Sequence, residues 1–173
     1  MLNSFLWILI VIVIAGLFSS AVTIPGVIGL YPSLRKPVGT PPEWLFGIIW
    51  PIMYTLLILS TYFGYESQFD TPVRGWIIIN FTLIAILIAL WSYVFFYMRN
   101  IKGGLIVILL LLFTSIYQFW TLSAYANNPI AGALLLPVVL WLLYATYLNM
   151  GVVVLNPTNN TTSTCGDVNE QIE

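Results

Sequence analysis

Residues 31–54 read YPSLRKPVGTPPEWLFGIIWPIMY and join a proline-rich polar loop directly to a long apolar segment. The loop is expected to be extended or turn-rich and not helical, because its prolines and the residues before them avoid helical geometry. A helix is predicted to follow, with Thr40 as N-cap, Pro41 at the first helical position and Glu43 at the spacing of a capping box. Three aromatic residues then recur every fourth position and share one face: Phe46, Trp50 and Tyr54.

The amino-acid composition is that of a membrane protein. Hydrophobic residues make up 60% of the 173 positions and charged residues 6%, with a mean hydropathy of +0.98, whereas about a quarter of a soluble domain is charged. The net charge of −1 argues against a nucleic-acid partner. The sequence has no histidine to bind a metal, and its single cysteine, Cys165, excludes an internal disulfide and a thiolate cluster. No metal and no cofactor are expected.

Five uncharged apolar runs are each long enough to cross a bilayer, which takes about 20 helical residues. They lack the alternating polarity of membrane β-barrel strands, so the sequence predicts an all-α membrane protein, a five-transmembrane-helix bundle. The first run could be a signal peptide, but it lacks a basic start and is too long, which favours a retained helix. The predicted helices are residues 2–21, 41–63, 76–98, 103–125 and 130–155, and the apolar part of the second starts at Trp44.

These helices make one transmembrane domain, residues 1–156, followed by a polar tail, residues 157–173, that is predicted to be disordered. Four basic residues fall in loops on the side of the C-terminus, and Arg74 alone lies on the other side: the four are Arg35, Lys36, Arg99 and Lys102. The positive-inside rule then places the N-terminus outside and the C-terminus in the cytosol, in a prokaryotic cell membrane or a eukaryotic organelle membrane. The N-x-T sequons at Asn159 and Asn160 would then carry no glycan.

The five apolar runs contain no Asp, Glu, Lys or Arg. Ionisable residues inside a membrane usually mark an ion or proton path, so a proton- or sodium-coupled transporter is not indicated. The polar side chains that are present are weak hydrogen-bonding groups, and their simplest interpretation is bonding between helices. They are Asn80, Thr82, Ser92, Thr114, Ser115, Gln118, Thr146 and Asn149.

The tryptophans divide by their position in the runs. Those near the ends of runs are expected at the membrane–water interface: Trp7, Trp44 and Trp76. Others lie well inside their runs, and two prolines are also internal, where each removes a backbone hydrogen bond and bends the helix. These internal residues are Trp50, Trp91, Trp141, Pro51 and Pro137.

Bent helices with inward rings and few polar groups describe a cavity for a flat apolar ligand. On the fifth helix one face combines large rings with a small residue that leaves space beside them: Trp141, Tyr144, Ala145 and Leu148. Plain aromatic core packing would produce the same periodicity. At this point both interpretations remain open.

Two groups of motifs make the chain resemble a known family. Residues 31–54 contain Y-x-x-L-x-K-P, P-P-x-W and W-x-x-x-Y, and residues 136–149 contain L-P-x-x-x-W-L-x-x-A-T-x-L-N. The chain thereby resembles the translocator protein / tryptophan-rich sensory protein family, also called the peripheral benzodiazepine receptor family. The resemblance implies a five-helix bundle whose pocket is closed by the first loop and binds porphyrins, such as protoporphyrin IX, or similar flat apolar molecules.

The same resemblance implies which residues bind the ligand. Carried over by position, they are Tyr31, Pro41, Trp50, Tyr54, Trp91, Ser92, Trp141 and Ala145. Trp50 and Trp141 match two tryptophans implicated in light-dependent porphyrin breakdown by bacterial members, since indole is easily oxidised by a photoexcited porphyrin. No general acid, base or nucleophile is visible, so no other catalytic residue is assigned.

Three positions depart from the family pattern. Gly39 stands where tryptophan is usual, Ile88 where asparagine is common, and Leu109 where an acidic residue is common. The loop and the polar end of the pocket are therefore less aromatic and less polar than in the family, which leaves the ligand open. The tyrosine and basic residue of the cholesterol-recognition pattern of animal members are also missing from residues 148–156.

Three function classes follow from these observations. The first is a sensor, regulator or transporter that binds porphyrins or other apolar small molecules within the lipid bilayer. The second is a light-dependent porphyrin-degrading enzyme acting through Trp50 and Trp141. The third is a membrane scaffold whose aromatic residues only pack. A homodimer is a further hypothesis, because Ala85 and Ala89 form a small-xxx-small pair on the third helix.

Overall fold

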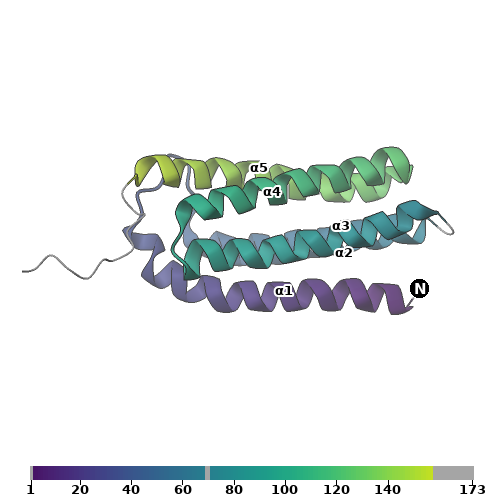
Figure 1. Ribbon diagram of the computed structural model, residues 1–173, viewed down its shortest axis with the longest axis horizontal. Helices are drawn as coiled ribbons and strands as arrows, with labels where there is room; N and C mark the ends of the chain where they lie inside the picture. The colour runs from purple at the N-terminus through teal and green to yellow at the C-terminus, as the bar shows by residue number, and fades with distance from the viewer. Residues whose placement is uncertain (1, 69–70, 158–173) are drawn as a thin grey trace, which may run out of the picture.

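A computed structural model describes residues 2–68 and 71–157, and Figure 1 shows long helices lying side by side in an elongated bundle. No strand occurs in these two stretches, and each of the five helices is long and apolar enough to cross a membrane. The predicted all-α, five-helix fold is confirmed. The helices are α1 (Leu2–Gly29), α2 (Glu43–Glu66), α3 (Pro72–Ser92), α4 (Ile101–Trp120) and α5 (Pro129–Leu155).

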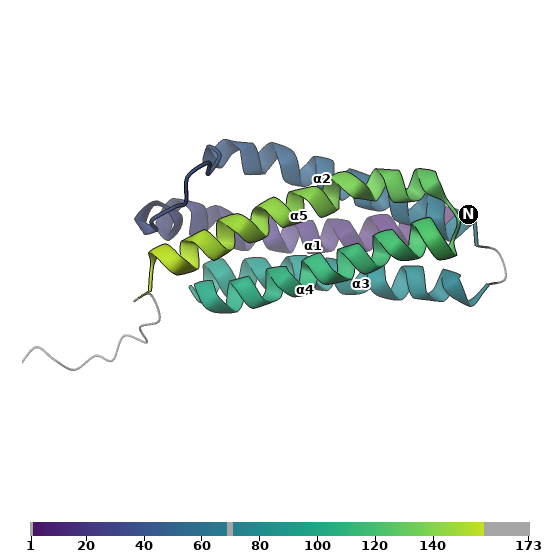
Figure 2. The same ribbon diagram turned by 90° about the horizontal axis from the view of Figure 1, so that it is seen from above.

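The helices form a ring in the order α1, α2, α5, α4, α3, and α3 closes the ring against α1. Figure 2 shows the bundle from above, with α5 in front of α1 and α4 in front of α3. The core between them includes side chains that are at most 1% exposed, such as Ile8, Phe81 and Leu135. Lipid tails are as apolar as these side chains, so close packing rather than water exclusion holds membrane helices together. Gly26 shows how close the approach is, because a Cβ atom there would overlap the Phe96 ring.

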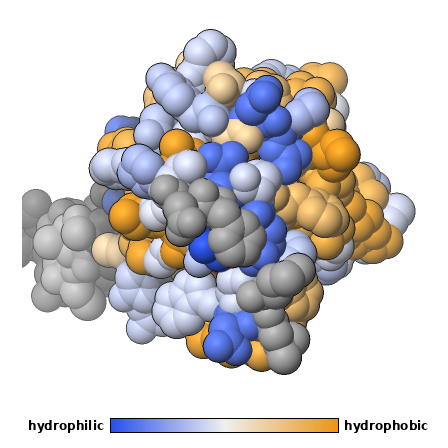
Figure 3. All heavy atoms as spheres, turned by 90° about the vertical axis from the view of Figure 1, so that its right-hand side faces the viewer, coloured by the Kyte–Doolittle hydropathy of each residue, from blue (hydrophilic) through white to orange (hydrophobic). Residues whose placement is uncertain are grey.

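The two ends of the bundle differ from its flanks. Figure 3 views the end that holds the N-terminus, where hydrophilic residues gather over the middle and hydrophobic residues lie to the sides. Polar side chains join the connections at this end: Gln68 Nε2 donates to the Ala126 carbonyl at 2.8 Å, and Asn128 Nδ2 donates to the Phe63 carbonyl at 3.2 Å. This arrangement fits polar ends in water and apolar flanks in hydrocarbon.

The opposite end collects the α1–α2 loop, the α3–α4 connection and the last described residues of α5 (Figure 1). The four basic residues of the predicted cytosolic loops therefore lie at one end of the bundle, as expected. They are Arg35, Lys36, Arg99 and Lys102. Which side of the membrane this end faces stays a prediction, and the polar tail with its sequons lies outside the described residues.

Helices α3 and α4 end in the same way. Each closes with one wider, π-helical turn, η2 (Tyr93–Tyr97) and η3 (Thr121–Tyr125). Each is followed by a residue with positive φ, Arg99 at 53° and Asn127 at 47°. An asparagine comes next in both connections, and its side chain accepts a hydrogen bond from a backbone N–H in the first turn of the following helix. This repeated turn lays α4 against α3 and α5 against α4.

The first helix is longer than predicted. α1 continues to Gly29 instead of stopping at residue 21, and it passes through Pro25. The prediction ended where the uninterrupted apolar run ended, but packing extends the helix, because Gly26 lies directly against Phe96. When the π-helical turns η2 and η3 are counted with α3 and α4, the start of α3 differs most among the remaining helix ends, at Pro72 instead of residue 76.

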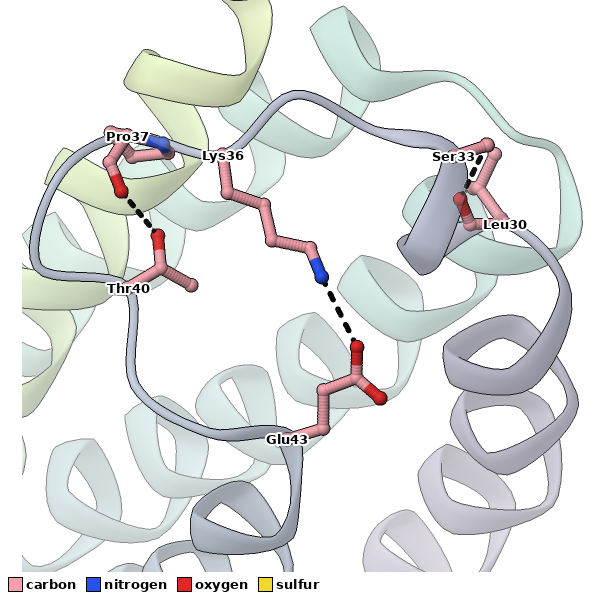
Figure 4. Close-up of polar contacts among 6 residues, drawn as sticks. All are labelled: Leu30, Ser33, Lys36, Pro37, Thr40 and Glu43. Atoms are coloured by element: carbon pink, nitrogen blue, oxygen red, sulfur yellow. Dashed lines mark hydrogen bonds and ion pairs between the residues drawn. The ribbon is translucent and has the colours of Figure 1, made fainter.

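The predicted capping box is wrong. α2 begins at Glu43 with Pro42 as its N-cap, and the Thr40 hydroxyl donates to the Pro37 carbonyl at 2.7 Å. The physical reason is that Pro41 precedes Pro42, which keeps Pro41 out of helical geometry, so the helix starts later and Thr40 is too far from it to be the N-cap. Glu43 is thereby free of a capping role and pairs with Lys36 across the loop (Figure 4).

The loop itself also departs from the prediction. Residues 31–40 were expected to contain no helix, yet Tyr31–Ser33 forms a single 3-10 turn, η1, in which the Leu34 N–H donates to the Tyr31 carbonyl at 3.3 Å. Pro32 favours this turn because its fixed φ suits the first positions of a helix. The rest of the loop is extended or turned, as predicted.

Of the eight polar side chains expected to form hydrogen bonds between helices, Asn80 and Gln118 do so. Asn80 Nδ2 on α3 donates to Gln118 Oε1 at 2.9 Å and to the Thr114 carbonyl at 3.0 Å, and Gln118 Nε2 on α4 donates to the Ile77 carbonyl at 3.3 Å. The threonines bond instead to carbonyls of their own helix, as threonine does in apolar helices: Thr82, Thr114 and Thr146.

The small-residue pair proposed for dimerisation lies largely inside the bundle. Ala85 is 2% exposed and belongs to the core, and Ala89 is half-buried. A second copy of the chain therefore has no access to Ala85, because α3 turns that residue toward its own neighbours. A homodimer as such stays a prediction, but it needs another contact surface.

Replacing Gln118 with leucine is expected to destabilise the bundle by about 1 kcal/mol, because it removes two hydrogen bonds between α3 and α4. Thermal unfolding in detergent, followed by near-UV circular dichroism, would measure the loss. Thr82→Val is the matched control, since its hydroxyl bonds only within α3. Equal midpoints for the two variants would contradict a role for Gln118 in joining the helices.

Candidate functional site: an aromatic cavity beneath the first loop

A cavity of about 510 Å³ lies in the half of the bundle that carries the first loop. All five helices and the loop contribute to its wall. Pockets that hold drug-sized ligands span about 300–1,000 Å³ and are lined mainly by apolar and aromatic side chains. This cavity has that size and that character. Of the two interpretations that the sequence left open, a cavity and plain aromatic core packing, the structure shows the cavity.

Nine of the 27 residues that line the cavity are aromatic. The predicted face of α2 is confirmed, because Phe46, Trp50 and Tyr54 all line the cavity, with the Trp50 and Tyr54 ring centroids 5.6 Å apart. From α5, Trp141 meets the ring of Phe46 edge to face at 6.1 Å. Such ring pairs are rigid and hold their neighbours in place.

The α3 side of the wall is a second aromatic group. Trp91 stacks on Phe95 with centroids 5.3 Å apart and an interplanar angle of 24°, and it meets Phe96 edge to face at 5.7 Å. Phe96 also packs against Tyr31 of the first loop. Aromatic rings therefore run from α3, through the loop, to α2 and α5.

The α1 side of the wall was missed by the sequence analysis. Ser19, Thr23 and Val27 line the cavity, and two of the three lie beyond the predicted end of the first helix. The spacing of Thr23 and Val27 on one helical face was the available signal, but it required a helix that continues through Pro25.

The cavity is open between α1 and α2. Its lining includes residues whose side chains are largely exposed, and these come from facing stretches of the two helices: Ile24 and Ile28 of α1, and Trp44 of α2. Trp44 is 66% exposed, and its position at the membrane–water interface stays a prediction. The flank of a membrane bundle faces lipid, so this opening faces the bilayer.

Hydrogen bonds from side chains of α5 to backbone carbonyls of the loop fix the loop to this helix. The Tyr144 hydroxyl donates to the Gly39 carbonyl at 2.6 Å, and the Tyr147 hydroxyl donates to the Val38 carbonyl at 3.0 Å. At the end of α5, Asn156 Nδ2 donates to the Arg35 carbonyl at 2.9 Å. Side chains of one helix thereby satisfy carbonyls that a loop leaves without partners.

The loop also needs a glycine on α5. A Cβ atom at Gly151 would lie 2.6 Å from the Cβ and Cγ atoms of Pro37, which is closer than carbon atoms approach. A second glycine, Gly39, has a φ of +86°, where other residues are strained. A tryptophan at position 39 would therefore be strained in this backbone conformation.

Tyr31 links the loop to the cavity. Its side chain is 8% exposed, lines the cavity and lies beneath the Lys36 ammonium, whose nitrogen is 4.1 Å from the ring centroid. Burial, with smaller contributions from Glu43 and Tyr144, raises the pKa of the Tyr31 phenol to about 12. An unfolded tyrosine ionises near pH 10, so this group lowers the free energy of unfolding only as the pH rises from about 10 to 12.

Several polar atoms of the wall have no hydrogen-bond partner among the described residues. They include the indole nitrogens of Trp91 and Trp141 and the Asn149 side-chain oxygen, all of them shielded from solvent. A buried donor without a partner costs about 1–3 kcal/mol. A small rotation of either indole toward the cavity would let it donate to an acceptor on a bound molecule.

The structure brings together seven of the eight predicted ligand-binding residues around the cavity: Tyr31, Trp50, Tyr54, Trp91, Ser92, Trp141 and Ala145. Pro41 is the exception, because α2 begins only at Glu43 and the chain at Pro41 runs outside the wall. Thr40 and Glu43 line the cavity in its place. Whether these residues bind a ligand stays a prediction.

Comparison with known proteins agrees with the fold and the motifs. A profile of the TspO/MBR family matches residues 7–155. This chain belongs to that family. It is 34% identical over 143 residues to the tryptophan-rich protein TspO of Archaeoglobus fulgidus, covering 82% of this chain and 89% of that protein.

Other TspO/MBR members are similar over most of their length. The chain is 32% identical to the protein CrtK of Rhodobacter capsulatus over 133 residues, 73% of this chain and 78% of CrtK. It is 27% identical to the human translocator protein over 128 residues, 69% of this chain and 70% of that protein. Family membership and five apolar helices together make the chain a multi-pass integral membrane protein.

Replacing Gly151 with alanine is expected to lift the loop from α5, because the new Cβ would overlap Pro37. Overpacking of this kind costs about 1–3 kcal/mol, enough to raise the fraction of open loop at least about fivefold. Trypsin cleavage after Arg35 in detergent would report the opening. Gly75→Ala is the control, since nothing lies within 4 Å of its added Cβ, and equal cleavage rates for both variants would show that the loop does not depend on Gly151.

Proposed function

We propose that this TspO/MBR protein binds porphyrins or similar flat apolar tetrapyrroles in its cavity and acts as a sensor, regulator or transporter of them. The observation that carries the proposal is the shape of the wall. Rigid rings from α2, α3, α5 and the loop surround a space of about 510 Å³. A flat aromatic guest would offset-stack on such rings or meet their edges.

The chemistry of the wall supports the same class of ligand. Apart from Glu43, the described lining residues carry no charge, so a strongly hydrated ligand would lose its water without compensation. A tetrapyrrole instead offers a wide apolar face and ring nitrogens that an indole N–H can approach. The family resemblance implies porphyrin binding as well, and relatives are named tryptophan-rich sensory protein and translocator protein.

The opening between α1 and α2 suggests how such a ligand would enter. An apolar tetrapyrrole dissolves in the bilayer, and the opening faces the bilayer. Entry from lipid needs no coupled ion or proton flow. This agrees with the five apolar runs, which contain no ionisable residue that could mark an ion or proton path. The loop, fixed to α5, would then close the aqueous end of the cavity.

Titration of the detergent-solubilised protein with protoporphyrin IX tests the proposal. Saturable quenching of tryptophan fluorescence is expected, and Trp141→Phe should weaken binding about threefold to tenfold through lost ring contact. Trp120→Phe is the matched control, because Trp120 is 58% exposed on the outer surface. Quenching that does not saturate, or equal affinities for the two variants, would overturn the proposal.

The second candidate, light-dependent porphyrin breakdown, is favoured by one observation. Trp50 and Trp141 line the same cavity, so both indoles would lie beside a photoexcited ligand. Illumination of the complex separates the two candidates. Ligand loss that disappears in a Trp50→Phe, Trp141→Phe double variant, while binding persists, would identify an enzyme; loss at the same rate in both proteins would leave a binding protein.

We also infer that the basic end of the bundle, with the C-terminus, faces the cytosol. The four basic residues at that end support this through the positive-inside rule. The single cysteine, Cys165, lies in the tail beyond the described residues and provides the measurement. A membrane-impermeant maleimide should label Cys165 only after the cells are permeabilised. Labelling of Cys165 in intact cells would show the opposite orientation.

A further inference from the structure

The ion pair between Lys36 and Glu43 lies at the loop end of the cavity. Lys36 Nζ is 3.1 Å from Glu43 Oε1, and Figure 4 shows the two side chains reaching toward each other between the loop and the start of α2. With the capping box absent, Glu43 has no bond to the Thr40 backbone, whose N–H donates to the Pro37 carbonyl instead. The structure therefore gives Glu43 a single described polar contact, the one to Lys36.

One member of the pair lines the cavity, and the other lies over a residue that does. Glu43 is the only charged residue among the described residues that line it. The Lys36 ammonium lies over the ring of Tyr31, which also lines the cavity, at 4.1 Å from the ring centroid. A positive charge is thus held against two residues of the wall, at the end where the apolar cavity meets the loop.

This pair is easy to exchange. The side chains of Lys36 and Glu43 are 27% and 42% exposed, and ion pairs with such access to water contribute little to stability. A carboxylate delivered by a ligand that fills the cavity would be more shielded from water than Glu43 is, and shielding strengthens a charge-assisted hydrogen bond. Lys36 would then exchange one carboxylate for another while keeping its place over Tyr31.

The start of α2 favours an anion at the same place. Its N-cap, Pro42, makes no side-chain hydrogen bond to the first turn of this 24-residue helix. The first backbone N–H groups of a helix carry partial positive charge, which stabilises a nearby carboxylate. Glu43 occupies this position in the structure, and only its side chain would move if a ligand carboxylate replaced it.

From this geometry we infer that Lys36 recognises a carboxylate edge on the ligand, and that Glu43 is the internal competitor which that carboxylate displaces. The inference deepens the proposed function and rests on it. It defines the ligand class as flat apolar molecules with an anionic edge, and it orients them with that edge at the loop and the apolar body among the tryptophans. Lys36 and Glu43 thereby set specificity, while the rings supply the apolar contact.

Two probes that differ only in charge test this assignment. Protoporphyrin IX carries two propionates, and its dimethyl ester has the same ring without charge. Both are titrated against the full chain in nanodiscs of zwitterionic phosphatidylcholine, so that lipid charge does not contribute. Lys36→Met, which keeps most of the stem but removes the charge, should weaken the diacid about tenfold and leave the diester unchanged.

Glu43→Gln should act in the opposite direction. Without its competitor, Lys36 is expected to bind the diacid about threefold to tenfold more tightly, while the diester again stays unchanged. This gain is the more demanding result, because a variant with a damaged loop would lose affinity for both probes. Lys102→Met is the matched control, since Lys102 is basic and lies at the same end, whereas the ion pair with Glu43 and the contact with the Tyr31 ring belong to Lys36.

The outcomes separate the inference from the proposed function. Opposite shifts for the two variants, confined to the diacid, support it. Equal shifts for diacid and diester, or a Lys102→Met effect as large as that of Lys36→Met, overturn it and leave porphyrin binding intact. If neither probe binds saturably to the unchanged chain, the proposed function fails and this inference fails with it.

Discussion

The docking of the first loop on α5 is the contact on which the site depends. Loop carbonyls need hydrogen-bond donors, and α5 supplies them from the Tyr144 and Tyr147 hydroxyls. Pro37 can approach only because Gly151 has no side chain. Without this docking Tyr31 would leave the wall, and the space among the helices would open to water at that end as well as to lipid at its side.

The cavity persists beneath the loop because its walls are stiff. Rings have few rotamers and pack against one another, so they do not collapse into the space as leucine or methionine would. Phe46, Trp91 and Trp141 each contact another ring, which fixes their orientation. The opposite half of the bundle contains aliphatic side chains and the Asn80–Gln118 pair, and it is closely packed. The molecule thus combines a solid half that maintains the helix positions with a hollow half that is suited to a guest.

At the cavity, charge is confined to the loop end. The apolar runs contain no ionisable residue, and Lys36 and Glu43 meet where the cavity reaches the loop. Such a site has an apolar interior and one polar edge, so a ligand that is apolar on its face and charged on its rim would match both. The same few residues, 31–43, therefore close the cavity, shape one wall and carry the charge.

The sequence by itself determined the number of helices and the face formed by Phe46, Trp50 and Tyr54, because hydrophobic length and helical period act locally. Seven of the eight residues placed at the cavity came instead from the family resemblance that its motifs carry. The sequence failed at Thr40, where two following prolines override the capping pattern, and at α1, whose last two turns are held by packing on Phe96. Only the tertiary structure decided that Ala85 faces inward, that α1 completes the wall, and that Glu43 meets Lys36. Each of these depends on which helices lie side by side, and that choice follows from the close packing of whole surfaces rather than from any one stretch of sequence.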